Sequence, residues 1–279
     1  MAADAPARDP HRPAPSLTLV GAGRMGGALL RGWLAGGLDP CRTVIVDPHA
    51  APEIAALCAE RGIGLNPSDP SPAETLVLAI KPQSFAAVAP GLAPWVGPGT
   101  LVLSILAGRT IAGIKAALPG AGAVVRAMPN LPASIGRGAT GAVASPETTQ
   151  AARARADALL AASGLVEWLD DEASIDAVTA VSGSGPAYVF LLAEALAEAG
   201  VAAGLAPETA ARLARATVSG AGALLDASPS EAAALRRDVT SPGGTTAAAL
   251  EVLMRADGLP DLLRAAVAAA QRRAGELAG

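Results

Sequence analysis

The amino-acid sequence predicts an α/β fold in its first part, followed by an all-α domain. Short apolar runs alternate with segments long enough for helices up to about residue 170, and from Ser174 onward only helical patterns remain. With 279 residues, 51% hydrophobic and 16% charged, the chain is long enough for roughly two folded domains. We therefore expect a tail over residues 1–15, an α/β domain over 16–170 and a helical domain over 171–279.

The expected strands of the first domain are short and rich in β-branched residues, as buried strands are. They are Leu17–Val20, Thr43–Val46, Thr75–Ile80, Thr100–Leu106 and Ala123–Met128. Met25–Gly36 and Ala51–Arg61 are long enough to be crossover helices between them. This alternation is typical of a doubly wound parallel sheet.

The helical domain begins with an amphipathic pattern, but many of its side chains are small. In "AYVFLLAEALAEAG" one face carries Tyr188, Leu191, Leu192, Ala195 and Leu196, with Glu194 and Glu198 opposite. The Ala-rich helix expected over Ala210–Leu225 allows close approach of backbones but buries little area. We expect a partner subunit to complete the core of this domain.

Composition excludes several classes of function. A net charge of -4 and a pI near 5.3 give no general attraction to nucleic acid. Cys41 and Cys58 are too few for a disulfide framework and lack zinc-site spacing, so we expect a reducing compartment and no metal. Charged residues interrupt each apolar run before the roughly 18 residues that a membrane span needs. The Pro/Ala-rich residues 1–15 read as a flexible tail rather than a signal peptide, and the expected location is the cytoplasm.

The first chemical signal is "VGAGRMGG", directly after the first strand. Gly21, Gly23 and Gly26 have the spacing that makes a tight turn, lets backbone approach a pyrophosphate, and packs helix on strand. Asp47 ends the next strand, where a carboxylate accepts from the ribose hydroxyls. The first domain is therefore predicted to be a Rossmann-like dinucleotide-binding domain.

The phosphorylation state of the dinucleotide stays open. Asp47 should repel a 2′-phosphate and favour NADH, whereas Arg24 and His49 place positive charge nearby. The sequence thus predicts NADPH or NADH as cofactor, with a slight preference for NADH.

Two loops leave the carboxyl ends of strands, which line the ligand crevice in such sheets. "AIKPQ" places Ile80, Lys81 and Pro82 beside the cofactor, although Lys81 also reads as an ordinary solvated lysine. "RAMPNLPASIG" has two prolines around Met128 and Asn130. It is either a stiff loop that presents an amide to the nicotinamide or simply a rigid turn.

The stretch "DVTSPGGTTAAALEVL" begins a helix with almost no side chains. Free backbone N–H groups at such a helix start suit a substrate carboxylate. The candidate residues are Ser241, Gly243, Gly244, Thr245 and Thr246. The only histidines are His11 and His49, and no nucleophile–base pair stands out. Hydride transfer to a protonated imine needs few acid–base groups and fits this set.

From Leu17 to the last helices the chain resembles pyrroline-5-carboxylate reductases, in "VGAGRMG", "AIKPQ", "RAMPNLPASIGRGATG", "AVSGSGPAYVF" and "DVTSPGGTTAAALEVL". The resemblance implies reduction of 1-pyrroline-5-carboxylate to L-proline by NAD(P)H, the last step of proline biosynthesis. It also implies a homodimer formed by the helical domain, which could assemble further, and a substrate site near the dimer interface.

The resemblance also assigns roles to residues. Ser241 and the backbone of Gly244–Thr246 would bind the substrate carboxylate, with the catalytic Thr246 hydroxyl near the ring nitrogen. Ser182–Pro186, including Ser184, would form the pocket floor. The cofactor set would be Gly21, Gly23, Arg24, Met25, Gly26, Asp47, Ile80, Lys81, Pro82, Met128, Pro129 and Asn130. One departure is "LLDASPSEAAALRRD", where many relatives have His-Pro, and it leaves one loop contact open.

Two alternatives to this function remain. A different imine or hydroxyacid reductase could use the same scaffold, but the hydroxyacid version would need a lysine in "AVSGSGPAYVFLLAEAL", which has none. A non-catalytic dinucleotide-binding sensor would not need the "SPGGTT" helix start.

Overall fold

The computed structural model describes residues 16–278, so the tail predicted for residues 1–15 lies outside the described residues. The chain forms two compact units. The first contains the residues up to Gly183 and those from Gln271 onward, and the second is Ser184–Ala270. The domain boundary predicted between residues 170 and 171 stays a prediction.

The first unit is built on an eight-stranded sheet with the order β3-β2-β1-β4-β5-β6-β7-β8. The strands from β1 to β6 are parallel to their neighbours, β7 is antiparallel to β6, and β8 is parallel to β7. Their bounds are β1 Leu17–Val20, β2 Thr43–Val46, β3 Gly64–Leu65, β4 Thr75–Leu78, β5 Leu101–Ser104, β6 Ala123–Met128, β7 Gly138–Ala144 and β8 Gly164–Trp168.

The sheet differs from the expected purely parallel one, and β7 is the main reason. Its sequence "GATGAVA" has low β-propensity, because glycine is unfavourable in a strand interior. A Cβ at Gly141 would lie 2.8 Å from the side chain of Val178, so close helix packing requires a small residue there. Tertiary packing therefore forms a strand that the local sequence does not predict.

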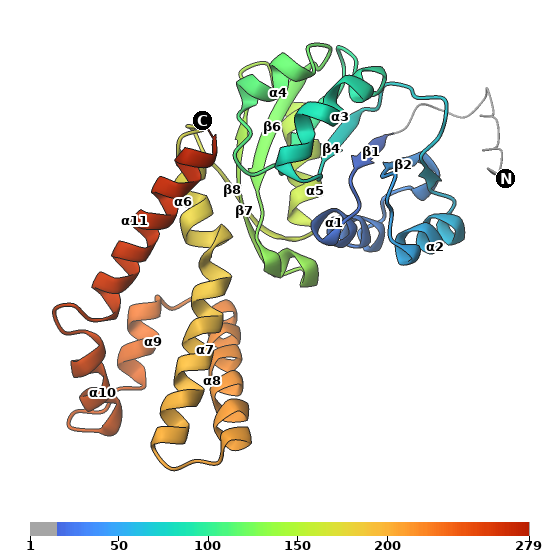
Figure 1. Cartoon of the computed structure of the whole chain (residues 1–279). Coiled ribbons are helices and arrows are strands. Elements are labelled where there is room, and N and C mark those ends of the chain that lie inside the picture. The colour runs from blue at the N-terminus through green and yellow to red at the C-terminus, as the bar shows by residue number, and fades with distance from the viewer. Residues whose placement is uncertain (1–15, 279) are drawn as a thin grey trace. The chain divides into compact units, whose positions relative to one another are not determined.

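Helices cover both faces of the sheet (Figure 1). The core on one face joins Leu29 and Trp33 of α1 with Ile54 of α2 and Leu160 of α5, and the other core contains Phe85 of α3 and Ile114 of α4. The helices are α1 Arg24–Ala35, α2 Pro52–Arg61, α3 Phe85–Leu92, α4 Ile111–Ala117 and α5 Gln150–Ala161. Short 3-10 helices are η1 Pro40–Arg42, η2 Pro82–Ser84, η3 Ala93–Trp95 and η4 Leu131–Ile135.

The first unit ends with α6 (Ser174–Val178) and a π-helical turn, η5 (Thr179–Gly183). The last residues of α11 (Leu259–Ala278) also belong to this unit. Ala274 is buried, and a Cβ at Gly275 would lie 3.6 Å from Asp176 Oδ2. The end of α11 therefore packs against α6.

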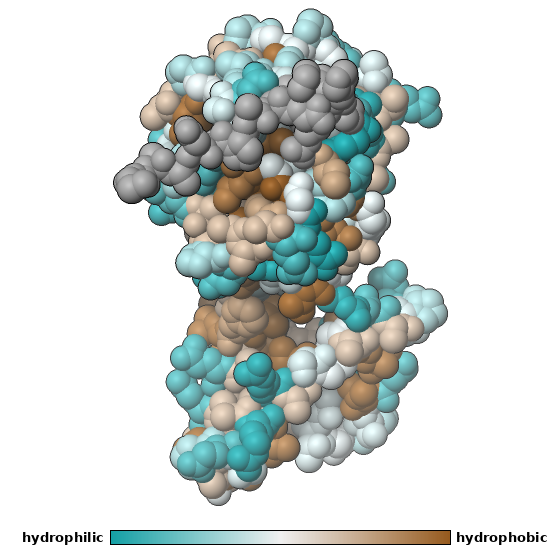
Figure 2. All heavy atoms as spheres, turned by 90° about the vertical axis from the view of Figure 1, so that its right-hand side faces the viewer, coloured by the Kyte–Doolittle hydropathy of each residue, from teal (hydrophilic) through white to brown (hydrophobic). Residues whose placement is uncertain are grey.

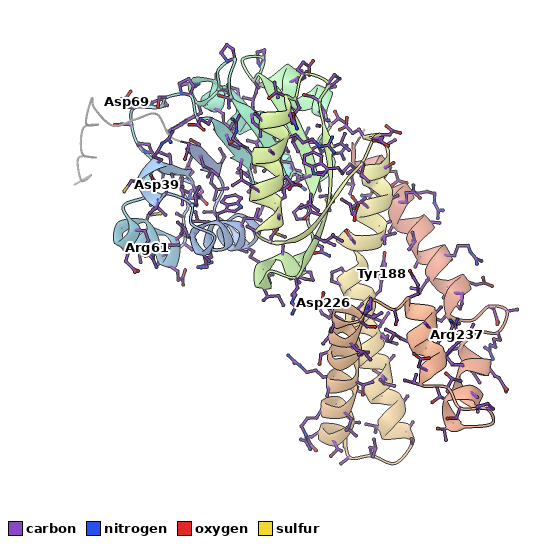
Figure 3. The ribbon with its side chains drawn as sticks, turned by 180° about the vertical axis from the view of Figure 1, so that it is seen from behind. Asp39, Arg61, Asp69, Tyr188, Asp226 and Arg237 are labelled. Carbon is purple, nitrogen blue, oxygen red and sulfur yellow. The ribbon has the colours of Figure 1, made fainter. Side chains whose placement is uncertain are left out.

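The second unit consists of helices: α7 (Gly185–Ala202), α8 (Pro207–Ala227), α9 (Ala232–Asp238), α10 (Thr245–Leu253) and the beginning of α11. α7 and α8 lie side by side (Figure 1), and a Cβ at Gly200 would come 3.2 Å from Ala210 Cβ. Figure 3 labels Tyr188 on α7, Asp226 on α8 and Arg237 on α9. The small residues Gly200 and Ala210 thus allow the close approach of α7 and α8 that the Ala-rich sequence predicts.

The second unit exposes much of its apolar surface. α7 has no buried residue, and Phe190 and Leu191 are 60% and 62% exposed. Figure 2 shows apolar surface, in brown, among the hydrophilic residues of this unit. Exposed apolar surface of this extent is typical of a face that another protein or a membrane covers.

One helical stretch, Ser174–Ala202, has 29 residues and contains an 18-residue window with a mean hydropathy of 1.3, so it is long and apolar enough to cross a membrane by length and composition. This window tolerates up to two charged residues, whereas the uncharged run between Asp176 and Glu194 ends short of the roughly 18 residues that the sequence prediction required. A helix that packs against other helices passes the same test, so this finding alone is weak evidence of a membrane.

Candidate cofactor and substrate sites

Two of the three glycines in the predicted cofactor turn leave no room for a side chain. Gly21 has φ +87°, and a Cβ there would lie 2.7 Å from Ile80 Cγ2. A Cβ at Gly26 would lie 2.1 Å from the carbonyl oxygen of Gly21. These contacts set the turn after β1 and the close packing of α1 on it.

The third glycine, Gly23, faces open space instead. It is the N-cap of α1, it has no side-chain cap, and no heavy atom lies within 4 Å of where its Cβ would be. Arg24 is exposed and Met25 half-buried in the first turn that follows. The N-terminal N–H groups of α1 are thus free to bind a pyrophosphate, and the turn fits a dinucleotide.

Asp47 is held in place by backbone N–H groups. Ala22 N donates to Oδ2 over 2.8 Å, and His49 N donates to Oδ1 over 2.9 Å. The side chain of Asn66 pairs with the backbone of Asp47 in both directions, each bond 2.8 Å long. Because a carboxylate can accept about four hydrogen bonds, Asp47 keeps acceptor capacity for ribose hydroxyls.

The loop after β4 carries the predicted residues Ile80, Lys81 and Pro82. Ile80 packs against the glycine turn, and Lys81 is exposed. The Pro82 carbonyl accepts from Arg109 Nε and Nη2 at 3.2 and 3.0 Å, which ties the loops after β4 and β5 together. Arg109 was not predicted from the sequence, although an arginine soon after a buried strand is a usable signal.

The loop after β6 is brought together with a motif far away in the sequence. Met128 Cε lies 3.0 Å from where a Cβ of Gly183 would be. Asn130 is buried, its Nδ2 donates to the Ser182 carbonyl over 3.2 Å, and its Oδ1 accepts from Ala139 N over 3.0 Å. The Asn130 amide is thus already bonded to protein backbone, and contact of residues 128–130 with the nicotinamide stays a prediction.

A buried ion pair supports the same strand. Arg126 of β6 is 5% exposed, and its Nη1 lies 2.8 Å from Glu172 Oε1. The same oxygen accepts from Ile111 N at the start of α4. The pair joins residues 46 positions apart, and no local pattern could have predicted it.

In the second unit, the start of α10 is as bare as the sequence predicts. Gly243 has φ +69°, and Gly244 is an extended N-cap without a side-chain cap. Gly244 N donates to Ser241 O over 3.0 Å, which closes a turn before the helix. Ser241 and Thr245 are exposed. The first-turn N–H groups can therefore bind an anion.

Ser184 is not brought to this loop within the second unit. It directly precedes α7, whereas α10 lies toward the opposite end of α7 (Figure 1). The predicted substrate residues thus lie in two places in one copy of the unit.

Among residues 16–278 there is no group of three or more His, Cys, Asp or Glu side chains that could hold a metal ion. The structure does form an open glycine turn at the start of α1, a carboxylate fixed by backbone N–H groups, and a bare start of α10. Together they suit a dinucleotide and a small acidic substrate.

Comparisons with known proteins agree with this geometry. Residues 172–277 match the family model for pyrroline-5-carboxylate reductase dimerisation, and residues 16–108 match that of NADP oxidoreductases, coenzyme F420-dependent. The pyrroline-5-carboxylate reductase of Pseudomonas aeruginosa is 43% identical over 95% of this chain and 97% of its own length. That of Pisum sativum is 34% identical over 92% of this chain and 94% of its own.

Solved structures give the same result. A pyrroline-5-carboxylate reductase from Coxiella burnetii matches with a TM-score of 0.87 and 35% identity, covering 96% of this chain and 100% of the other. The Plasmodium falciparum pyrroline carboxylate reductase, solved with NADP bound, matches with a TM-score of 0.77 and 24% identity, covering 95% and 98%, and shares the fold. With relatives this similar over almost their whole length, the chain belongs to the pyrroline-5-carboxylate reductase family.

Proposed function

We propose that this chain reduces 1-pyrroline-5-carboxylate to L-proline with NADPH or NADH, the final step of proline biosynthesis. The observation that carries the proposal is the presence in one chain of a cofactor turn open at Gly23 and a bare helix start at Gly244. It is therefore an oxidoreductase that acts on a CH–NH bond. No feature of the described residues favours the hydroxyacid reductase or the non-catalytic sensor.

On the cofactor side, the backbone at Gly23, Arg24 and Met25 binds the pyrophosphate, and Asp47 accepts from the ribose hydroxyls. When bound, NAD(P)H supplies the hydride. The loops that border the nicotinamide are Ile80–Pro82 and Met128–Asn130.

On the substrate side, Ser241 and the N–H groups of Gly244–Thr246 hold the carboxylate of the pyrroline ring. The Thr246 hydroxyl accepts a hydrogen bond from the protonated ring nitrogen, which keeps the imine carbon oriented for attack. Ser184 forms part of the pocket floor. Since the imine arrives protonated, the site needs no separate proton donor.

The chain forms a homodimer through the helical unit, as its dimerisation model indicates. We infer that a second copy, rather than lipid, covers the exposed face of α7. The separation of Ser184 from α10 within one unit supports a substrate site completed by both copies. We further propose a cytoplasmic enzyme whose dimers can assemble further.

The test is the oxidation of NADH and NADPH by the purified protein with 1-pyrroline-5-carboxylate as substrate. Reduction of NAD(P)+ by L-proline at alkaline pH measures the reverse reaction. Turnover with this imine and none with 2-hydroxyacids or 2-oxoacids is the expected result. Cofactor binding without turnover of any imine would support the sensor instead.

A further inference from the structure

We propose that Asn130 is a positioning residue that fixes the nicotinamide loop to η5 by replacing a helix hydrogen bond that Pro186 removes. The proposal rests on the proposed function, because its effect is expected in the hydride-transfer step. It assigns the Asn130 side chain to the protein backbone rather than to the cofactor.

The need for Asn130 begins with a carbonyl group in η5. In an α-helix the carbonyl of Ser182 would accept from the N–H of residue 186. Residue 186 is proline, which has no N–H. The helix path is already irregular here, because residues 179–183 form a π-helical turn. The Ser182 carbonyl therefore needs a donor from outside its own helix.

The Asn130 side chain supplies that donor, and it also accepts a hydrogen bond from the backbone N–H of Ala139. Its Nδ2 lies 3.2 Å from the Ser182 carbonyl oxygen, and its Oδ1 lies 3.0 Å from Ala139 N. The register of β6 with β7 runs from Val125↔Ala144 to Met128↔Gly141, so Ala139 lies beyond the last pair. With Asn130 only 9% exposed, water competes little for either bond.

These bonds act on the residues that the proposed function places at the nicotinamide. Met128 and Pro129 directly precede Asn130, and Met128 Cε packs against Gly183, 3.0 Å from where a Cβ would be. The hydrogen bond and this contact thus fix the position of the loop after β6 relative to η5. A shift of about 1 Å in such supporting parts can slow a reaction by about a hundredfold.

Only an amide satisfies both partners. An aspartate at position 130 still accepts from Ala139 N, but it directs an oxygen at the Ser182 carbonyl and has no hydrogen to donate. Asn130→Asp therefore removes one bond while keeping the size of the side chain. We expect it to lower kcat about 10- to 100-fold with little change in the Kd of NADH. The deuterium isotope effect with 4-deuterated NADH should rise, because hydride transfer becomes more rate-limiting.

Pro186→Ala provides a second, independent variant. It restores an N–H at residue 186, which can donate to the Ser182 carbonyl as in a regular helix. Whatever its own effect on kcat, we expect Asn130→Asp to cost at least fivefold less in this background than in the wild type. Such coupling is what a double-mutant cycle measures.

Thr100→Val is the matched structural control. The Thr100 hydroxyl is also buried and bridges two backbone groups, accepting from Gly97 N over 3.0 Å and donating to Ala73 O over 2.7 Å. It lies just before β5, at the opposite end of the parallel strands from the cofactor loops. It should lower the Tm and leave kcat unchanged.

The outcomes separate this inference from the proposed function. A wild-type protein that does not reduce 1-pyrroline-5-carboxylate overturns both. If the wild type is active, the positioning role is overturned by an Asn130→Asp variant with normal kcat and isotope effect. It is also overturned if the loss of kcat is equal in both backgrounds, or if Asn130→Asp, like Thr100→Val, lowers only the Tm.

Discussion

Asp47 shows how a single charged residue is fixed before any ligand arrives. The N–H groups of Ala22 and His49 hold its two oxygens, so the negative charge is fixed in place at the end of β2. A 2′-phosphate there would meet a fixed like charge. We therefore predict a preference for NADH, even though the family model for residues 16–108 is named for NADP.

Replacement of Asp47 by serine should shift the preference between cofactors. Loss of a fixed charge contact worth about 1 to 3 kcal/mol raises the NADPH-to-NADH ratio of kcat/KM roughly tenfold to a hundredfold. Steady-state kinetics with both cofactors measure this ratio. Asp47→Asn is the control of matched shape, and an unchanged ratio in both variants would mean that the carboxylate does not contact the ribose.

Replacement of Thr246 by valine should affect the chemical step. Valine keeps the shape of threonine and loses only the hydroxyl, whose bond to a charged nitrogen is worth about 1.5 to 3 kcal/mol. We expect kcat to fall roughly ten- to a hundredfold, with a smaller change in KM, because without this bond the imine carbon is held less accurately for hydride transfer.

Gly244→Val is the partner variant for this test, since it crowds the backbone that binds the carboxylate. It should raise KM for the substrate more than it lowers kcat. Full kcat in Thr246→Val together with lost binding in Gly244→Val would restrict the loop to holding the carboxylate.

At the scale of elements, the turn between β1 and α1 contains one glycine that packing requires, Gly26, and one that packing does not require, Gly23. A Cβ at Gly26 would clash with the Gly21 carbonyl, whereas a Cβ at Gly23 would have no heavy atom within 4 Å. We therefore expect Gly26 to be needed for stability and Gly23 for cofactor binding.

Alanine substitutions should reveal this difference. Gly26→Ala overpacks the turn and should cost about 1–3 kcal/mol of stability, measured as a lower Tm. Gly23→Ala should keep the wild-type Tm and weaken NADH binding, because its methyl group points where the pyrophosphate approaches. Calorimetry and NADH fluorescence titration measure the two effects. Equal Tm loss in both variants would contradict this division.

Whether an element of the fold could be predicted depends on whether its own sequence or its packing against other elements stabilises it. The bounds of β1, β2 and β6 agree with the sequence prediction, because short, mainly apolar runs containing β-branched residues specify buried strands locally. β4 and β5 end earlier than expected, at Leu78 and Ser104, since the residues after them turn into the cofactor loops. β7 and β8 were missed because their stability comes from packing and pairing rather than from local propensity.

The candidate site divides in the same way. The positions of Gly21, Asp47 and the loop of Ile80 at one edge of the sheet could be predicted, since they follow parallel strands whose carboxyl ends meet there. The contacts of Arg109 with Pro82 and of Asn130 with Ser182 could not, because each joins two segments distant in sequence. Motifs thus predict candidate site residues, but not the partners that hold them.

At the scale of the whole molecule, the exposed apolar face of α7 makes the helical unit depend on a second copy. We expect Leu192→Glu, which places a charge on this 50% exposed side chain, to give a monomer without reductase activity. Sedimentation velocity measures the mass, and NADH titration should show that the first unit still binds cofactor. Glu198→Gln on the same helix is the control and should stay dimeric. An active Leu192→Glu dimer would place the interface elsewhere.

The return of α11 to the first unit affects how the chain folds as the ribosome makes it. Gln271 and the residues after it pack with α6, but they are synthesised only after the whole of Ser184–Ala270. At roughly 5–20 residues per second, this delay is on the order of several seconds. The sheet can form during that time, whereas the surface of α6 beside Asp176 stays uncovered. The nascent first unit is therefore exposed to aggregation and to chaperones until translation has passed Gly275.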